Sequence, residues 1–382
     1  MNEQLLTMGA VGTSLKKNEK RAPLDPAHLP LIDEELRQHM YFETGYGERF
    51  GVDDATLASQ VAGLMSREEL FARCDIILLP KPVESDFPYF REGQTLWGWP
   101  HCVQGQAITQ VAIDKKMTLI AWEAMNIWKD DKWQMHIFQK NNELAGYASV
   151  LHALQLKGMT GSYGPSKRIA VISFGATARG AVFALLGQGY QDITVFAQRP
   201  TFGLTNQIPG IDYQSFSYLP DDPTTVFVET PDGDVPIAEV MAGFDIIVNC
   251  IFQDTERPLL YIEGDEVDLL QPDTLIIDVS CDTGMGFDFA RPTSFDDPTF
   301  VVGNGITYYA VDHSPSYLWR AATYEISEAL LTFIEPVMRG NANQETEQTL
   351  KRAIEIENGV IQNPAILRFQ NRSETYPHPI LG

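Results

Sequence analysis

Residues 168–180 read Arg168-Ile169-Ala170-Val171-Ile172-Ser173-Phe174-Gly175-Ala176-Thr177-Ala178-Arg179-Gly180. The apolar run is typical of a buried strand. A glycine-containing turn follows it, and a helix pattern continues to Leu186. A strand that leads through a tight turn into a helix N-terminus offers free N–H groups to a dinucleotide pyrophosphate. Because the motif starts near residue 168, we expect an inserted cofactor domain, with the substrate-binding residues upstream.

Composition narrows the classes of protein to consider. The 382 residues favour two domains, and 44% hydrophobic residues are enough for a large core. The net charge of −23 argues against binding to nucleic acid or to an anionic membrane. The four cysteines form no C-x-x-C pair, so we expect reduced thiols and no metal site. With no signal-peptide pattern and no long apolar run, a cytoplasmic protein is expected.

Strand-like and helix-like segments alternate along the chain, which indicates an α/β fold. In the first part we expect strands at Leu5–Ala10, Asp75–Leu79, Thr95–Trp99 and Met117–Trp122, and helices at Asp54–Leu64, Arg67–Arg73, Val103–Asp114 and Ile137–Lys157. In the second part we expect strands at Arg168–Phe174, Asp192–Ala197, Phe244–Cys250, Thr274–Val279, Thr299–Val302 and Ile306–Val311.

The pattern predicts two Rossmann-like domains, each with a mostly parallel sheet, joined by two long interdomain helices. The substrate domain would comprise residues 1–138 and 313–382, and the dinucleotide-binding domain residues 139–312. Residues 201–242 read as an insertion with a hairpin around Pro231-Asp232-Gly233. The second interdomain helix is expected within 316–339, followed by a polar helix at Glu345–Glu357 and an irregular tail.

The turn departs from the usual G-x-G-x-x-G fingerprint. Gly175 and Gly180 match its first and third glycines, and Thr177 replaces the second. At the end of the next strand, Ala197-Gln198-Arg199 lacks the carboxylate that binds the ribose of NAD, and Arg199 is able to pair with a 2′-phosphate. NADPH is therefore the expected cofactor, with NADH as the alternative.

Three upstream segments carry groups suited to redox chemistry on amino or oxo acids. Arg21 offers a guanidinium fork for a carboxylate. Lys81 follows an apolar strand, where desolvation lowers the pKa of a lysine toward a useful range. His101 also follows a strand, and histidine exchanges protons near neutrality.

These residues, the Gly175 turn and the segment 277–284 occur in an order that resembles the alanine dehydrogenase/transhydrogenase alpha-subunit superfamily. Two branches are most similar. Residues 86–94 and 98–101 resemble N5-(carboxyethyl)ornithine synthase, whereas 249–251, 278–283 and 312–316 resemble the lysine-forming saccharopine dehydrogenase of fungi. The resemblance covers about residues 5–335, without the 201–242 segment and the tail after Gly340.

The resemblance implies a role for each matching position. Arg21 would hold the oxo-acid carboxylate, Lys81 and His101 would exchange protons, and Asp282 would lie by the nicotinamide. The implied cofactor-binding residues are Gly175, Ala176, Thr177, Gly180, Gln198, Arg199, Cys250 and His313. An arginine of these relatives is not matched here, and His136 or Lys140 lies nearby as its substitute in substrate binding. His313 stands where alanine dehydrogenases carry asparagine.

The expected function is NAD(P)H-dependent formation or cleavage of a C–N bond between an amino acid and a 2-oxo acid, through an imine. One alternative is an amino-acid dehydrogenase of the alanine type. An alternative of another class is a non-catalytic nucleotide-binding module of the transhydrogenase type. The expected partners are the two small-molecule substrates, with a homo-oligomer left open.

Overall fold

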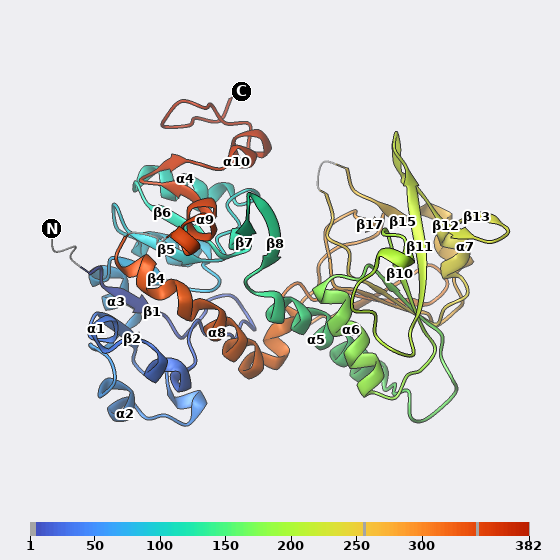
Figure 1. Cartoon of the computed structure of the whole chain (residues 1–382), viewed down its shortest axis with the longest axis horizontal. Coiled ribbons are helices and arrows are strands. Elements are labelled where there is room, and N and C mark those ends of the chain that lie inside the picture. The colour runs from blue at the N-terminus through green and yellow to red at the C-terminus, as the bar shows by residue number, and fades with distance from the viewer. Residues whose placement is uncertain (1–4, 255–256, 341–343, 382) are drawn as a thin grey trace. The chain divides into compact units, whose positions relative to one another are not determined.

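The computed structural model describes residues 5–254, 257–340 and 344–381 (Figure 1). The chain divides into two compact units, Met1–Gln139 with Trp319–Gly382, and Lys140–Leu318. Each unit is built on one large, mostly parallel sheet, which confirms the predicted fold class. The long helices α5 (Gln139–Lys157) and α8 (Trp319–Met338) begin where the chain passes from one unit to the other.

The sheet of the first unit has the strand order β3-β2-β1-β4-β5-β6, followed by β20 and β21. All neighbouring strands from β3 to β6 are paired in parallel. Strands β2 and β3 follow on one side of β1, and β4, β5 and β6 follow on the other side, so the strand order reverses at β1. Ligands of α/β proteins bind at the carboxyl ends of strands around such a switch point. In sheet order the strands are Gly63–Met65, Met40–Glu43, Met8–Ala10, Ile76–Leu78, Thr95–Gly98, Thr118–Ala121, Ile354–Glu357 and Val360–Ile361.

Helices cover both faces of this sheet. Alternate residues of a strand point to opposite faces, so Ile76 and Leu78 of β4 lie in one core and Ile77 lies in the other. Helix α8 packs into the first core, and α3 and α4 pack into the second. The helices besides α8 are α1 (Glu34–Arg37), α2 (Asp54–Ala58), α3 (Arg67–Arg73), α4 (Gln106–Asp114), α9 (Gln344–Ala353) and α10 (Pro364–Phe369), and a hairpin is formed by β7 (Asn126–Lys129) and β8 (Lys132–His136).

The second unit repeats the same plan. Its parallel strands have the order β11-β10-β9-β14-β16-β19, with the switch point at β9. Antiparallel strands extend both edges, β12 and β13 beyond β11 and β18 beyond β19. In sheet order from β13 to β18 the strands are Gly233–Pro236, Asp222–Thr230, Asp212–Leu219, Ile193–Ala197, Ile169–Ile172, Ile246–Asn249, Leu275–Asp278, Ile306–Tyr309 and Thr299–Val302. The unit also contains α6 (Ala176–Gly187), α7 (Ile237–Met241), β15 (Leu260–Ile262) and β17 (Gly286–Phe287).

Several predictions of secondary structure are wrong in part, and where strands replace the expected elements, pairing with a sheet overrides the local pattern. The helix expected at Asp54–Leu64 ends at Ala58, and β3 begins at Gly63. The helix expected at Glu345–Glu357 gives way to β20 at Ile354, and the expected irregular tail contains β21 and α10. Within 201–242 the hairpin is confirmed, but β11 is a regular member of the parallel sheet.

None of the helices in the described part of the chain combines the length and the apolar character needed to cross a bilayer.

Two glycines allow α5 and α6 to pack closely. A Cβ added at Gly180 of α6 would lie 1.8 Å from the carbonyl oxygen of Glu143 in α5. A Cβ at Gly146 of α5 would lie 1.9 Å from the carbonyl oxygen of Thr177 in α6. Each glycine therefore makes room for the backbone of the other helix.

We predict that Gly180→Ala lowers the free energy of unfolding by about 1–3 kcal/mol, because backbone must move to admit the methyl group. The matched control on the same helix is Gly187→Ala, whose Cβ would have only the Tyr147 hydroxyl at 3.9 Å. It should be neutral or slightly stabilising. Urea unfolding followed by circular dichroism measures both; equal losses would show that the close approach does not matter.

Candidate active site

The predicted catalytic residues of the first unit lie after neighbouring strands of its sheet. Lys81 follows β4, His101 follows β5, and β4 and β5 are paired in parallel. The carboxyl ends of parallel strands meet at one edge of a sheet, so both side chains leave from that edge. Arg21 lies in the connection after β1, which pairs with β4 on its other side.

Lys81 and His101 contact each other directly. The Nζ atom of Lys81 lies 2.9 Å from Nε2 of His101, a hydrogen-bond distance. One of the two nitrogens donates this hydrogen bond and the other accepts it, so the bond runs either from the Lys81 ammonium to the ring or from the ring N–H to the Lys81 amine. The His101 side chain is 49% exposed, so this pair is open to solvent. The geometry is that of two groups able to exchange a proton with each other and with a ligand.

The backbone around this pair is unusual in two ways. His101 has a φ of 50°, a left-handed conformation that is uncommon outside glycine and is often found at functional sites. At Gly98 a Cβ would lie 1.9 Å from the carbonyl oxygen of Leu79, so only glycine lets the ends of β4 and β5 approach so closely. The N–H of Trp99 then donates to the Pro80 carbonyl at 2.9 Å, extending the pairing toward Lys81 and His101.

A third residue of this site, Glu123, was not predicted. It follows β6, the neighbour of β5, and its Oε1 accepts a hydrogen bond from the His101 backbone N–H at 2.7 Å. The same oxygen lies 3.7 Å from Nδ1 of the His101 ring. Burial is the main reason why the pKa of Glu123 rises to about 7. The rule that led to Lys81 and His101, the first polar residue after an apolar strand, would have found it.

Arg21 is buried and already has a carboxylate partner. Its Nε donates to Oε1 of Glu19 at 2.8 Å and its Nη2 to Oε2 at 2.6 Å. The guanidinium carbon lies 4.9 Å from the ring centre of Trp99, and Nζ of Lys81 lies 5.9 Å from the same ring. Trp99 therefore connects Arg21 with the Lys81–His101 pair.

The two proposed substitutes for the unmatched arginine belong to different units, His136 to the first and Lys140 to the second. Lys140, in the first turn of α5, is 64% exposed and pairs with Glu143 at 3.1 Å. His136 is partly buried; its Nδ1 accepts the N–H of Phe138 at 3.0 Å, and burial lowers its pKa.

In the second unit the predicted catalytic residue Asp282 and several predicted cofactor residues follow five adjacent parallel strands, β10, β9, β14, β16 and β19. They are Gln198 and Arg199 after β10, Gly175 after β9, Cys250 after β14, Asp282 after β16 and His313 after β19. A single edge of the sheet thus carries the whole set.

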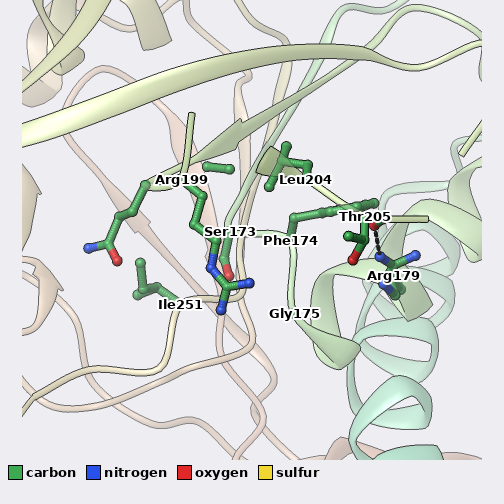
Figure 2. A pocket seen from close by; sticks show the side chains of 10 residues that line it. Ser173, Phe174, Gly175, Arg179, Arg199, Leu204, Thr205 and Ile251 are labelled. Atoms are coloured by element: carbon green, nitrogen blue, oxygen red, sulfur yellow. Dashed lines mark hydrogen bonds between the residues drawn. The ribbon is translucent and has the colours of Figure 1, made fainter. Parts of the chain in front are cut away.

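A cavity of about 230 Å³ lies at the β9–α6 turn (Figure 2). Its lining combines predicted residues, Gly175, Gln198 and Arg199, with others that the motif did not single out: Ser173, Phe174, Arg179, Ala197, Leu204, Thr205 and Ile251. Figure 2 shows Arg199 reaching from the end of β10 toward the turn. Arg179 instead donates to the carbonyl groups of Asn206 and Thr205, at 2.7 and 2.9 Å.

The turn has the features that a phosphate group requires. Gly175 is the N-cap of α6, and glycine has no side chain that could accept a hydrogen bond from the first turn of the helix. The N–H groups of Ala176 and Thr177 therefore receive no cap from Gly175. Gly175 presents bare backbone to the cavity, and Arg199 adds a positive charge. Gly180 has a different place: it packs against α5 and does not line the cavity.

The ends of β14, β16 and β19 form a buried polar network. Asp278 accepts hydrogen bonds from the side chain of Asn249 at 2.9 Å, from the Cys281 N–H at 3.1 Å and from the Tyr308 hydroxyl. Burial raises the pKa of Asp278 to about 6 and also raises that of Asp282. Asp278 thus holds in place the turn that presents Asp282.

Two further predicted cofactor residues are buried. Burial raises the pKa of the Cys250 thiol, so it remains protonated. His313 pairs through Nδ1 with Asp312, and its buried Nε2 has no hydrogen-bond partner among the described residues.

Comparison with known proteins finds curated relatives and a solved structure with a similar fold. A curated relative, the N(5)-(carboxyethyl)ornithine synthase of Clostridium botulinum, is 28% identical over 82% of this chain and 89% of its own length. The alanine dehydrogenase of Methanococcus maripaludis is 25% identical over 94% of this chain and 91% of its own length. A solved L-alanine dehydrogenase shares the fold, with a TM-score of 0.75 over 95% of this chain and 99% of that chain at 17% identity.

Two family models match the chain, and together they cover more than half of it. The alanine dehydrogenase/PNT N-terminal domain matches residues 11–145, and the C-terminal domain of the same family matches residues 223–364. The second match includes part of the 201–242 segment and part of the tail, so the expectation that both lie outside the resemblance is wrong. The chain belongs to the alanine dehydrogenase/PNT family.

Proposed function

We propose that this protein is an NAD(P)H-dependent oxidoreductase that forms or cleaves a C–N bond between an amino acid and a 2-oxo acid. The observation that carries the proposal is the Lys81–His101 pair, with Glu123 beside it, at the carboxyl edge of the first sheet. Imine formation from an amine and a ketone needs a group that takes protons and another that returns them. A module that only binds nucleotide has no use for this pair.

The relatives support this class of reaction. The names of carboxyethylornithine synthase and alanine dehydrogenase both imply chemistry at a carbon–nitrogen bond. An alanine-type dehydrogenase is the second candidate, because the relative of that name aligns over the larger share of this chain. The two candidates differ in the amine that adds to the oxo acid, either an amino acid or ammonia.

The residues of the first unit account for substrate binding and proton transfer. Arg21, which Glu19 holds through Nε and Nη2, is the residue that we propose binds the substrate carboxylate. His101 and Lys81 exchange their shared proton with the amine and with the oxygen that leaves as water. Glu123 holds the His101 backbone in its left-handed conformation by accepting its N–H.

The second unit would hold the dinucleotide. Gly175 and the first-turn N–H groups of α6 suit the pyrophosphate, and Arg199 suits a 2′-phosphate, which favours NADPH. When bound, the nicotinamide supplies the hydride that reduces the imine carbon. Asp282, Cys250 and His313 follow strands at the same edge of the sheet and would surround that ring.

We predict that Lys81→Met and His101→Asn each lower kcat by about 10²–10⁴-fold while the Kd for NADPH stays unchanged. Asparagine is chosen at position 101 because it tolerates a positive φ. The control is Lys132→Met, an exposed lysine at the start of β8. The assay follows NADPH oxidation with pyruvate or 2-oxoglutarate crossed against ornithine, lysine, alanine and ammonia, with mass spectrometry of the product.

A secondary amine product would support the synthase proposal, and alanine formed from pyruvate and ammonia would support the second candidate. Turnover that survives in both variants would rule out the mechanism. Binding of NADPH without turnover on any substrate pair would favour the non-catalytic module.

A separate prediction concerns cofactor choice. Arg199→Gln should weaken NADPH binding by about 10–100-fold and leave NADH binding unchanged, since one charge-assisted hydrogen bond to a phosphate is lost. Arg291→Gln is the control, because Arg291 is exposed in the same unit and does not line the cavity. Fluorescence titration gives both Kd values. A wild-type preference for NADH would contradict the assignment of Arg199.

A further inference from the structure

The C-terminal segment, residues 370–381, contacts the turn at residues 101–105 that carries His101. Figure 1 draws this last part of the chain in red, with α10 near α4. Helix α10 packs into the second core of the sheet through Ile366, in the same core as Ile108 of α4 and Cys102. Gln370 is the C-cap of α10 and is only 2% exposed. The match to the C-terminal family model ends at residue 364, so Gln370 lies beyond it.

The side-chain amide of Gln370 is hydrogen-bonded at both ends. Its Oε1 accepts from Nε of Arg372 at 2.7 Å. Its Nε2 donates to the Cys102 carbonyl at 2.7 Å and to the Thr109 hydroxyl at 3.2 Å. Arginine only donates and a carbonyl only accepts, so these partners determine which end of the amide carries the N–H groups. The amide therefore connects the C-terminal segment to Cys102, the residue after His101.

A second donor reaches the same carbonyl group. The hydroxyl of Thr109, a buried residue of α4, donates to the Cys102 carbonyl at 3.0 Å. A carbonyl oxygen has two lone pairs, and here the two donors are Thr109 and Gln370. Two buried side chains from distant parts of the sequence thus meet on one backbone atom, and they fix this peptide group from two directions.

The rest of the C-terminal segment holds Gln370 in place. Arg372 is 4% exposed, and its Nη1 donates to the side chain of Gln110 in α4 at 2.9 Å and to the His378 carbonyl at 3.1 Å. Nε2 of His378 accepts the N–H of Ile361, in β21, at 3.1 Å. Buried polar groups are costly unless they are hydrogen-bonded, and these groups are. The segment is therefore tied both to α4 and to the edge of the sheet.

His101 is the residue that needs this support. Its φ of 50° is uncommon for a residue with a side chain, and such a conformation persists only where the surrounding structure determines it. On one side, Glu123 accepts the His101 N–H at 2.7 Å. On the other side, the Gly105 N–H donates to the His101 carbonyl at 2.8 Å. The two hydrogen bonds to the Cys102 carbonyl complete the set that fixes the backbone of this turn.

We propose that Gln370 is a positioning residue for His101: it holds the Cys102 carbonyl and so fixes the turn that presents the His101 ring to Lys81. The catalytic part of this inference rests on the proposed function, whereas the effect on the turn is measurable without any substrate. The ring lies 2.9 Å from Nζ of Lys81, so a displacement of the turn by about 1 Å breaks this hydrogen bond.

The variant Gln370→Glu tests the contact. It keeps an oxygen as acceptor for Arg372 and replaces the donor to the Cys102 carbonyl with a carboxylate oxygen that repels it. The matched control is Gln362→Glu. It makes the same chemical change at an exposed glutamine, whose amide donates to the Val360 carbonyl at 3.2 Å.

Amide hydrogen exchange of the full-length protein, without any ligand, reports on the turn. In Gln370→Glu we expect the protection of the His101 and Gly105 amides to fall by about tenfold, because both donate hydrogen bonds within the turn region. The Leu79 amide donates to the Trp97 carbonyl in the sheet and should keep its protection. The control variant should leave all three amides unchanged.

A second variant removes the other donor. Thr109→Val has nearly the same shape but no hydroxyl, and it should lower the protection of the same two amides. Unchanged protection in Gln370→Glu, with a thermal melt showing that it folds, would overturn the proposal. So would an equal loss at Leu79, which is the result of lower stability alone. If Gln370→Glu does not fold, unchanged protection in Thr109→Val would overturn the link between the Cys102 carbonyl and the turn.

Steady-state kinetics then connect the turn to His101. Gln370→Glu should lower kcat by about tenfold with the KM for NADPH unchanged, because a small displacement of a proton-transfer group reduces turnover. In the His101→Asn background the same substitution should have no further effect, since Gln370 acts through the ring. A kcat equal to that of the wild type, or equal losses in both backgrounds, would overturn the positioning role. If the wild type shows no turnover on any substrate pair, the proposed function fails, while the exchange result still decides whether Gln370 fixes the turn.

Discussion

Parallel pairing of short strands is the constraint on which the rest of the structure depends. In each unit the chain returns to the same sheet edge at the end of every parallel strand, so residues far apart in sequence leave the sheet side by side. Lys81 and His101 are twenty residues apart, yet they hydrogen-bond because β4 and β5 are in register. Gly98 has no side chain, and this lets the ends of β4 and β5 lie close together.

This constraint explains which parts of the site were predictable. A strand that is buried on both faces is a continuous apolar run, so its end is visible in the sequence as the first polar or proline residue. Lys81, His101 and Arg199 each lie two or three residues after the end of such a strand and were predicted. Glu123 obeys the same rule, because it lies just after the apolar strand that ends at Ala121.

Other features depend on contacts that no local pattern encodes. Strand β11 carries the polar sequence Asp-Tyr-Gln-Ser-Phe-Ser-Tyr-Leu, and only its pairing with β10 makes it a member of the sheet. The pairing of Arg21 with Glu19 sits in an irregular loop. The bulge that buries Glu355 exists only because β20 pairs with β6, more than two hundred residues earlier in the chain. Such pairings are properties of the assembled sheet, and a strand pattern alone does not locate them.

A buried carboxyl group, Glu355, lies where the end of the chain joins the sheet of the first unit. An ionised carboxylate is costly to bury, and burial accordingly raises the pKa of Glu355. Because β20 pairs with β6, the segment after α8 extends the sheet whose strand ends carry Lys81, His101 and Glu123.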